Sequence, residues 1–189
     1  MRNHFSKTAA GCALAIGCLA RVASAQAPPA APVSTVVANP TYISIPLEIT
    51  VNRPAAEVWK RIGKYCDIGE WLRLPCTITS GKDGEFGAIR SVGSEVLVGK
   101  TELSYTYTQP VREGRPYNLY HGTLEARPVT ATTSKLVYTL VLDNSMLADD
   151  AAREKDKTQK AATFQRALEN MKILAEGGTL PPAPARGGR

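Results

Sequence analysis

Hydrophobic residues near the end of the chain recur at steps of three and four, which predicts a long amphipathic helix from Asp149 to Glu176. Asp149 and Asp150 stand where a helix N-terminus is capped, and Gly177 stands where a helix ends. The apolar side consists of Phe164, Leu168, Met171 and Leu174 with Ala161 and Ala175 beside them, whereas Lys157, Lys160, Glu169, Lys172 and Glu176 fall largely off it. A broad apolar surface must therefore cover this helix.

Apolar and polar residues alternate from Ile43 to Val51, which predicts a half-buried strand. Pro54 then opens a helix, since proline is tolerated in a first turn. Asp67 to Glu70 has the spacing of a capping box for a short second helix that carries Trp71. The buried side of the first helix is expected to consist of Val58, Ile62 and Tyr65.

From Cys76 onward, alternating runs are separated by short turns, which indicates an antiparallel sheet. The expected strands are Thr77 to Thr79, Ala88 to Val92, Glu95 to Val98, Glu102 to Thr108, Tyr117 to Arg127 and Leu136 to Leu142, with one of the turns at Gly99-Lys100. The element order β-α-α-β6-α predicts an α+β domain over residues 41–176, in which a curved sheet grips the terminal helix.

Three segments carry a resemblance to a known superfamily. They are Ile49-Thr50-Val51-Asn52-Arg53-Pro54-Ala55-Ala56-Glu57-Val58-Trp59, Asp67-Ile68-Gly69-Glu70-Trp71 and Gly84-Glu85-Phe86-Gly87-Ala88-Ile89-Arg90. Together with the element order, they resemble the SRPBCC superfamily of START-like, Bet v 1-like and polyketide cyclase/dehydrase-like proteins. The resemblance covers about Ile43 to Glu176 and implies a helix-grip fold.

That resemblance implies a cavity between sheet and helix that holds a hydrophobic or amphipathic small molecule. Rings with polar tips suit such a site, although the same residue types also fill packed cores. The expected ligand-binding residues are Trp59, Trp71, Arg90, Glu95, Tyr105, Tyr107, Tyr120, Tyr138, Phe164 and Leu168, with Tyr117 as a further ring of this kind. The leading hypothesis is thus a small-molecule binding module.

Arg90 stands in a strand where alternation can point it inward, and an inward arginine needs a carboxylate partner such as Glu95 or Glu102. The alternative is an exposed strand arginine. A second hypothesis is a polyketide cyclase/dehydratase-type enzyme on the same fold. Its polarising and proton-transfer groups would come from Arg90, Glu95, Glu102, Tyr105 or His121.

Metal and cofactor chemistry has little support in the sequence. His121 is the one histidine after residue 25, and neither Cys-x-x-Cys nor His-Glu-x-x-His occurs. The P-loop and the dinucleotide fingerprint are also missing. We therefore expect no metal and no cofactor, and interpret His121 as a partly exposed strand residue.

The first residues have the pattern of an export signal. Basic Arg2 and Lys7 precede an apolar run from Thr8 to Ala20, and small residues lead up to Ala25. We expect a signal peptide over residues 1–25, cut after Ala25, and a periplasmic or secreted protein. The run is too short for a permanent membrane anchor. Acylation of Cys18, as in a lipoprotein, is the weaker alternative.

Composition changes this picture in three respects. Residues 26–40 form an Ala/Pro-rich linker, and residues 177–189 form a similar tail expected to be disordered. Without residues 1–25 the formal charge falls from +6 to 20 minus 17, or +3, with basic and acidic residues interleaved, so a nucleic-acid partner is not expected. Cys66 and Cys76 remain, either as a disulfide or as two thiols.

Overall fold

The computed structural model describes residues 39–112 and 117–182. The expected signal peptide, most of the linker and residues 183–189 of the expected tail lie outside this part. The elements are β1 (Tyr42–Val51), α1 (Ala55–Ile62), α2 (Ile68–Trp71), β2 (Ile78–Ser80), β3 (Ile89–Arg90), β4 (Glu95–Thr101), β5 (Ser104–Thr108), β6 (Tyr120–Pro128), β7 (Ser134–Asp143) and α3 (Asp150–Ala175).

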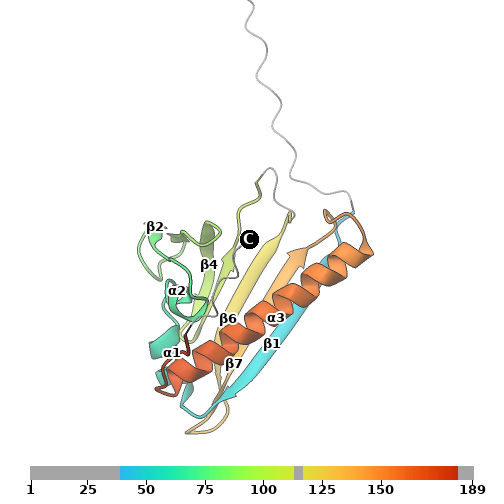
Figure 1. The fold of residues 1–189 in the computed structure, drawn as a ribbon. Coiled ribbons are helices and arrows are strands. Elements are labelled where there is room, and N and C mark those ends of the chain that lie inside the picture. Colours follow the sequence, from blue (N-terminus) through green and yellow to red (C-terminus); the bar gives the residue numbers. More distant parts are fainter. Residues whose placement is uncertain (1–38, 113–116, 183–189) are drawn as a thin grey trace, which may run out of the picture. The chain divides into compact units, whose positions relative to one another are not determined.

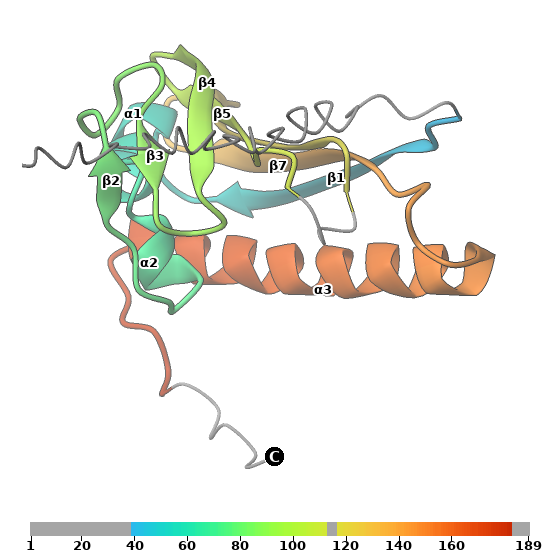
Figure 2. The ribbon, with the colours of Figure 1, turned by 90° about the horizontal axis from the view of Figure 1, so that it is seen from above.

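The seven strands form one antiparallel sheet in the order β1-β7-β6-β5-β4-β3-β2. Helix α3 lies along one face of this sheet, and α1 and α2 sit near its C-terminal end (Figures 1 and 2). Helix α3 packs chiefly on β1, and it also contacts β7, α1 and α2. The α+β helix-grip fold predicted from the sequence is therefore confirmed.

Alternation explains why the sheet has one buried face. All ten residues of β1 pair with β7, from Tyr42 opposite Asp143 to Val51 opposite Ser134. Side chains on successive residues point to opposite faces of a strand, so every second residue reaches the core. The hydrophobic residues of β6 and β7 with no exposed surface are Leu124, Leu136, Tyr138, Leu140 and Leu142.

Helix α3 begins and ends where the sequence predicts. The Asp149 side chain accepts a hydrogen bond from the Ala152 amide at 2.7 Å, which caps the helix. Gly177 has φ of 88°, a value that favours glycine after a helix. All buried residues of α3 lie in its second half, namely Phe164, Ala167, Leu168, Met171 and Leu174.

Two local predictions are wrong. Asp67 does not cap α2, because its carboxylate accepts from the Lys64 amide and Glu70 pairs with Arg61. Gly99 is not in a turn, because β4 continues to Thr101 with an irregular register at Gly99. Neither error changes the topology.

The folded part extends beyond the expected boundary at Glu176. The Gly178 amide donates to the Ile173 carbonyl, and partly buried Leu180 packs against the core. The Arg73 guanidinium donates to the Pro181 carbonyl at 2.5 Å. Residues 177–182 therefore belong to the folded unit rather than to the tail.

Candidate functional site

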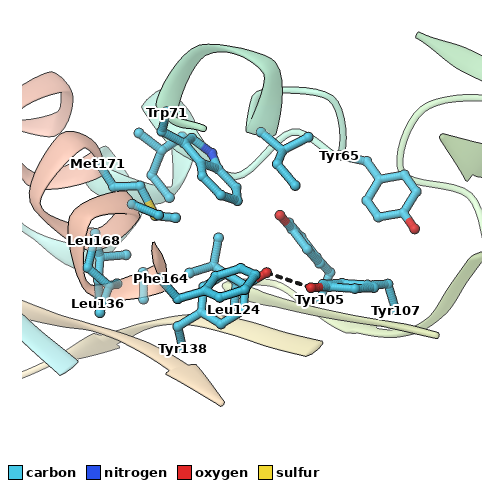
Figure 3. Close-up of a cluster of buried hydrophobic side chains, with 14 of the residues drawn as sticks. Tyr65, Trp71, Tyr105, Tyr107, Leu124, Leu136, Tyr138, Phe164, Leu168 and Met171 are labelled. Carbon is cyan, nitrogen blue, oxygen red and sulfur yellow. Dashed lines mark hydrogen bonds between the residues drawn. The ribbon is translucent and has the colours of Figure 1, made fainter. Parts of the chain in front are cut away.

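A layer of rings fills the middle of the space between the sheet and α3 (Figure 3). The ring centroids of Tyr138 and Phe164 are 4.6 Å apart, and those of Trp71 and Tyr138 are 6.2 Å apart. Trp71, Tyr138 and Leu168 have no exposed surface. Sheet and helix are thus in direct contact at the middle of the grip.

A strand glycine decides how these rings pack. Gly122 faces the core directly opposite Tyr107 on the neighbouring strand. A Cβ on Gly122 would lie 2.3 Å from the Tyr107 ring, so only glycine lets the ring lie flat against β6. The Tyr107 hydroxyl then reaches the Tyr138 hydroxyl at 2.8 Å.

Polar atoms at the centre of this layer lack partners among the described residues. They are the hydroxyls of Tyr65 and Tyr105 and the indole Nε1 of Trp71. The Trp71 nitrogen and the Tyr105 hydroxyl turn toward the same region between α2 and the sheet (Figure 3). Burial raises the pKa of Tyr105 despite Arg90 nearby, so the phenol stays neutral and can donate. An unpartnered buried polar atom costs about 1 to 3 kcal/mol.

A buried ion pair lies beside the ring layer. Arg90 Nε is 2.7 Å from Glu95 Oε2, and Arg90 Nη1 donates to the Tyr65 carbonyl at 2.7 Å. The guanidinium lies 4.3 Å from the Tyr65 ring centroid and 4.6 Å from that of Tyr107. Arg90 thus points inward and takes Glu95, not Glu102, as its partner. The two charges pair with each other, although Arg90 Nη2 makes no well-aligned hydrogen bond among the described residues.

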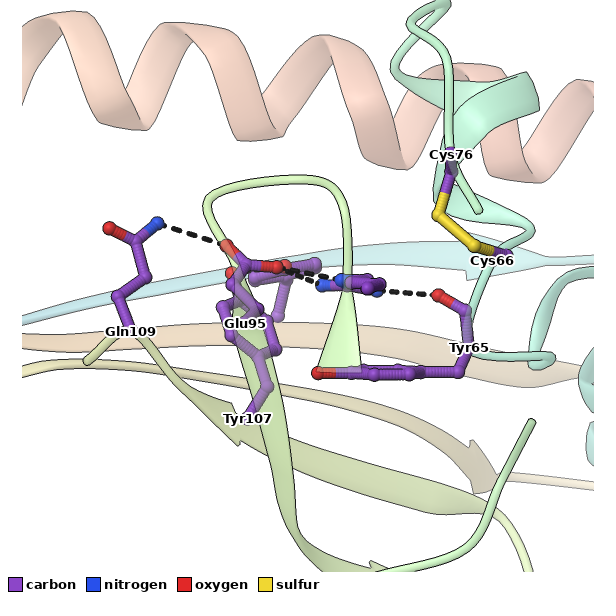
Figure 4. Close-up of polar contacts among 8 residues, drawn as sticks. Tyr65, Cys66, Cys76, Glu95, Tyr107 and Gln109 are labelled. Carbon is purple, nitrogen blue, oxygen red and sulfur yellow. Dashed lines mark hydrogen bonds and ion pairs between the residues drawn. A yellow bond between two sulfur atoms is a disulfide. The ribbon is translucent and has the colours of Figure 1, made fainter. Parts of the chain in front are cut away.

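The neighbours of this pair connect it to two other parts of the fold (Figure 4). Gln109 Nε2 donates to the second Glu95 oxygen at 3.0 Å. On the other side, Tyr65 precedes Cys66, which forms a disulfide with Cys76. The disulfide therefore helps to fix the carbonyl that receives the Arg90 hydrogen bond.

The open end of the grip is a hollow of about 320 Å³ between α3 and the ends of β5 and β6. Its lining consists of Gln109, Tyr117, Tyr120, Asp156, Gln159, Lys160, Thr163 and Phe164. Tyr120 and Phe164 are nearly buried and belong to the core, so the inner wall of this end hollow is aromatic. Gln109 links the hollow to Glu95.

A charged group on α3 forms the polar wall of the end hollow. Lys160 Nζ and the Tyr117 hydroxyl each lie 2.5 Å from Asp156 Oδ1. Lys160 Nζ also lies 4.3 Å from the Tyr117 ring centroid. Burial and Asp156 raise the pKa of Tyr117, so its hydroxyl keeps its proton. The prediction that Lys160 falls off the buried stripe is wrong, because it faces these rings one turn before Phe164.

The expected site residues fall into separate places. Tyr120 and Phe164 line the end hollow, whereas Trp71, Tyr107, Tyr138 and Leu168 fill the core behind it. Trp59, Glu102 and Tyr105 line another hollow, of about 340 Å³, which includes no α3 residue. His121 lies half-buried on the outer sheet face, with Nε2 3.4 Å from Thr108 Oγ1. The sequence patterns did not identify Gln109, Asp156, Gln159 or Thr163 as site residues. They also placed Lys160 off the buried side of α3.

Among the residues that the structure covers, no group of three or more His, Cys, Asp or Glu side chains is arranged to hold a metal ion. The same part of the chain has no helix with the length and hydrophobicity needed to span a membrane.

Comparison with known proteins places the fold but not the activity. Neither a protein-family model nor a curated protein sequence matches the chain. The structure is similar to the ZhuI aromatase/cyclase from Streptomyces sp. R1128, with a TM-score of 0.55 and 17% identity over 74% of this chain and 100% of that chain. The chain shares its fold with this aromatase/cyclase.

Other solved structures share this helix-grip, Bet v 1-like fold. A Thermobifida fusca protein solved by NMR matches with a TM-score of 0.59 and 22% identity, over 73% of this chain and 97% of that chain. The di-domain aromatase/cyclase BexL matches with a TM-score of 0.53 and 17% identity, over 71% of this chain and 46% of that chain. At such identities the likeness extends to the fold alone.

Proposed function

We propose that this protein binds a hydrophobic or amphipathic small molecule in the end hollow, as a START-like member of the SRPBCC superfamily. The observation that carries the proposal is the composition of that hollow. Its inner wall is aromatic and continuous with the core, and its outer wall is polar. Ligand sites combine apolar surface with a few placed polar groups, and this hollow offers three rings beside five polar side chains.

The unpartnered atoms of the core support the same proposal. Phe164 borders both the end hollow and the Tyr138 ring, so a guest that shifts Phe164 approaches the core. The Tyr105 hydroxyl and Trp71 Nε1 have no partner among the described residues, and a second polar atom at the inner end of such a guest could satisfy one of them. Satisfying these atoms would offset part of the cost of moving the rings.

Binding explains the polar residues better than catalysis does. Arg90 and Glu95 lie together, but they are buried and satisfy each other. Glu102 and Tyr105 line the other hollow, and His121 lies on the outer sheet face. Of the groups that the enzyme hypothesis names, Glu102 and Tyr105 share one concavity, whereas Arg90, Glu95 and His121 do not line it. That hollow lies away from α3, and binding in the end hollow is the one function that we propose.

Export to the periplasm or the medium is part of the proposal. The signal-like pattern of residues 1–25 motivates it, and the disulfide between Cys66 and Cys76 supports it, because such bonds persist in oxidising compartments. Mass spectrometry of the protein purified from its producing cells should give the mass of a chain that begins at Gln26. A chain that retains residues 1–25 would contradict export with cleavage.

The binding proposal is tested by filling the end hollow. Thr163 is exposed on α3 and lines the hollow, so Thr163→Trp should block it. Thr158→Trp is the matched control, because Thr158 is exposed on the same helix and lies outside the hollow. Amide chemical shifts of the wild type should move around Tyr120 and Phe164 when nonanol is added, and Thr163→Trp alone should abolish the effect. Equal shifts in both variants would place any binding elsewhere.

A further inference from the structure

The polar wall of the end hollow offers one hydrogen-bond donor and one acceptor side by side. Lys160 Nζ carries three protons, and two of them serve Asp156 Oδ1 and the Tyr117 hydroxyl. Asp156 Oδ1 accepts hydrogen bonds from both Lys160 and Tyr117, while Asp156 Oδ2 has no partner among the described residues. The wall therefore has one ammonium proton and one carboxylate oxygen left over.

We infer that the polar end of the guest is a neutral hydroxyl group, which donates to Asp156 Oδ2 and accepts from Lys160 Nζ. This inference rests on the proposed binding function and specifies its ligand class. A hydroxyl is the simplest group that can fill both roles at once. An aliphatic or aromatic alcohol thus fits the hollow, with its apolar part against Tyr120 and Phe164.

Other head groups fit less well. A carboxylate can only accept, so it would leave Asp156 Oδ2 unpartnered and add a second negative charge beside it. An ammonium would face Lys160 in the same hollow. A ketone carries no charge but offers no proton to Asp156. Since Lys160 and Asp156 balance each other, the wall favours a neutral guest.

The structure shows how the carboxylate can reach the guest. Asp156 Oδ2 is shielded from solvent, although Asp156 lines the hollow. The torsion about the Cβ–Cγ bond of aspartate has a broad distribution, so a small turn can bring Oδ2 to the hollow. A volume of about 320 Å³ corresponds to roughly ten water molecules at about 30 Å³ each, so it has room for a chain of about nine carbon atoms.

Three nonyl compounds of this size test the inference on the purified wild type. Nonanol, nonanone and nonanoic acid share an apolar chain and differ in the polar group. Titrations followed by amide chemical shifts around Phe164 should show nonanol binding about tenfold more tightly than either of the others, because one hydrogen bond to a charged group is gained. Nonanoic acid or nonanone binding as tightly as nonanol would overturn the inference and leave the proposed function standing.

Replacement of the acceptor should reverse the preference. In Asp156→Asn the amide oxygen can still receive Lys160, while the amide NH₂ replaces Oδ2 and donates instead of accepting. Nonanone should then bind at least as tightly as nonanol. Asp150→Asn is the control, since Asp150 is fully exposed on the same helix and should keep the preference for nonanol.

The outcomes separate the two proposals. Absence of binding by all three compounds to the wild type would overturn the proposed function together with the inference. A folded Asp156→Asn variant that still prefers nonanol would overturn the inference alone. The wild-type comparison needs no variant, so the inference remains testable even where Asp156→Asn does not fold.

Discussion

Gly122→Ala tests whether the ring layer is packed as described. The new Cβ would lie 2.3 Å from the Tyr107 ring, whereas carbon atoms in contact are about 3.5 Å apart. The ring must therefore move by about 1 Å and lose its hydrogen bond to Tyr138. Overpacking costs about 1 to 3 kcal/mol and the lost bond about 1 kcal/mol, partly offset by removal of a strand glycine. We expect a net loss of about 1 to 3.5 kcal/mol in the free energy of unfolding.

Urea unfolding followed by tryptophan fluorescence measures this loss, because Trp71 is buried in the same layer. Gly99→Ala is the matched control. A Cβ at this second strand glycine would lie 3.4 Å from its nearest neighbour, the Thr106 side chain, which is an ordinary contact. We expect Gly99→Ala to be neutral or to stabilise the protein by about 0.5 kcal/mol.

A second substitution isolates the cause. In Tyr107→Leu the ring is absent, so the further change Gly122→Ala should cost much less than it does in the wild type. Equal losses for Gly122→Ala and Gly99→Ala would refute the reasoning, and so would a Gly122→Ala cost that does not depend on Tyr107.

Three further predictions concern the surroundings of the ring layer. Arg90→Met leaves Glu95 buried without its partner and should cost about 3 to 5 kcal/mol by urea unfolding, and Arg90→Met with Glu95→Leu should cost less than Arg90→Met alone. Replacement of Cys66 and Cys76 by serine should cost about 2 to 3 kcal/mol, because the disulfide closes a short loop, and no loss would contradict its role. Burial holds the pKa of His121 below its ordinary value of 6.5, so protonation favours the unfolded state. The stability that neutral His121 provides is present above about pH 6.5 and lost as the pH falls. His121→Asn should therefore show a weaker decline in stability between about pH 7 and pH 5 than the wild type, and an unchanged decline would count against this role.

Local patterns were enough to predict the framework. The spacing of Phe164, Leu168, Met171 and Leu174 identified the buried side of α3, because a helix presents every third or fourth residue on one face. Asp149 marked the start of α3 by its capping chemistry. Alternation allowed Arg90 an inward orientation with Glu95 or Glu102 as its partner, but it did not decide against an exposed arginine, and the fold selects the pair with Glu95.

The polar wall of the end hollow could not be predicted from these local patterns. Asp156 and Lys160 continue the inward stripe of α3 toward its N-terminus, but charged residues are normally assigned to the solvent face. Their burial depends on Tyr117, which is distant in sequence and reaches them only once the sheet has formed. The helical spacing of Lys160 from Phe164 was the one signal that could have identified them.

The sequence also could not predict how completely side chains fill the space between the sheet and α3. Ring-rich strands can surround a cavity or occupy it, and composition is the same in both cases. In this protein the filling depends on single contacts, such as the space that Gly122 leaves for the Tyr107 ring. Such contacts follow from strand register, which pairs these two residues.

Intermolecular nuclear Overhauser effects between a bound guest and the protein test the central claim most directly. With nonanol added to the labelled wild-type protein, we predict contacts from the alkyl chain to the ring protons of Tyr120 and Phe164, and from the carbon beside the hydroxyl to Lys160. Contacts confined to residues outside the end hollow, or no contacts at saturating nonanol, would contradict the account.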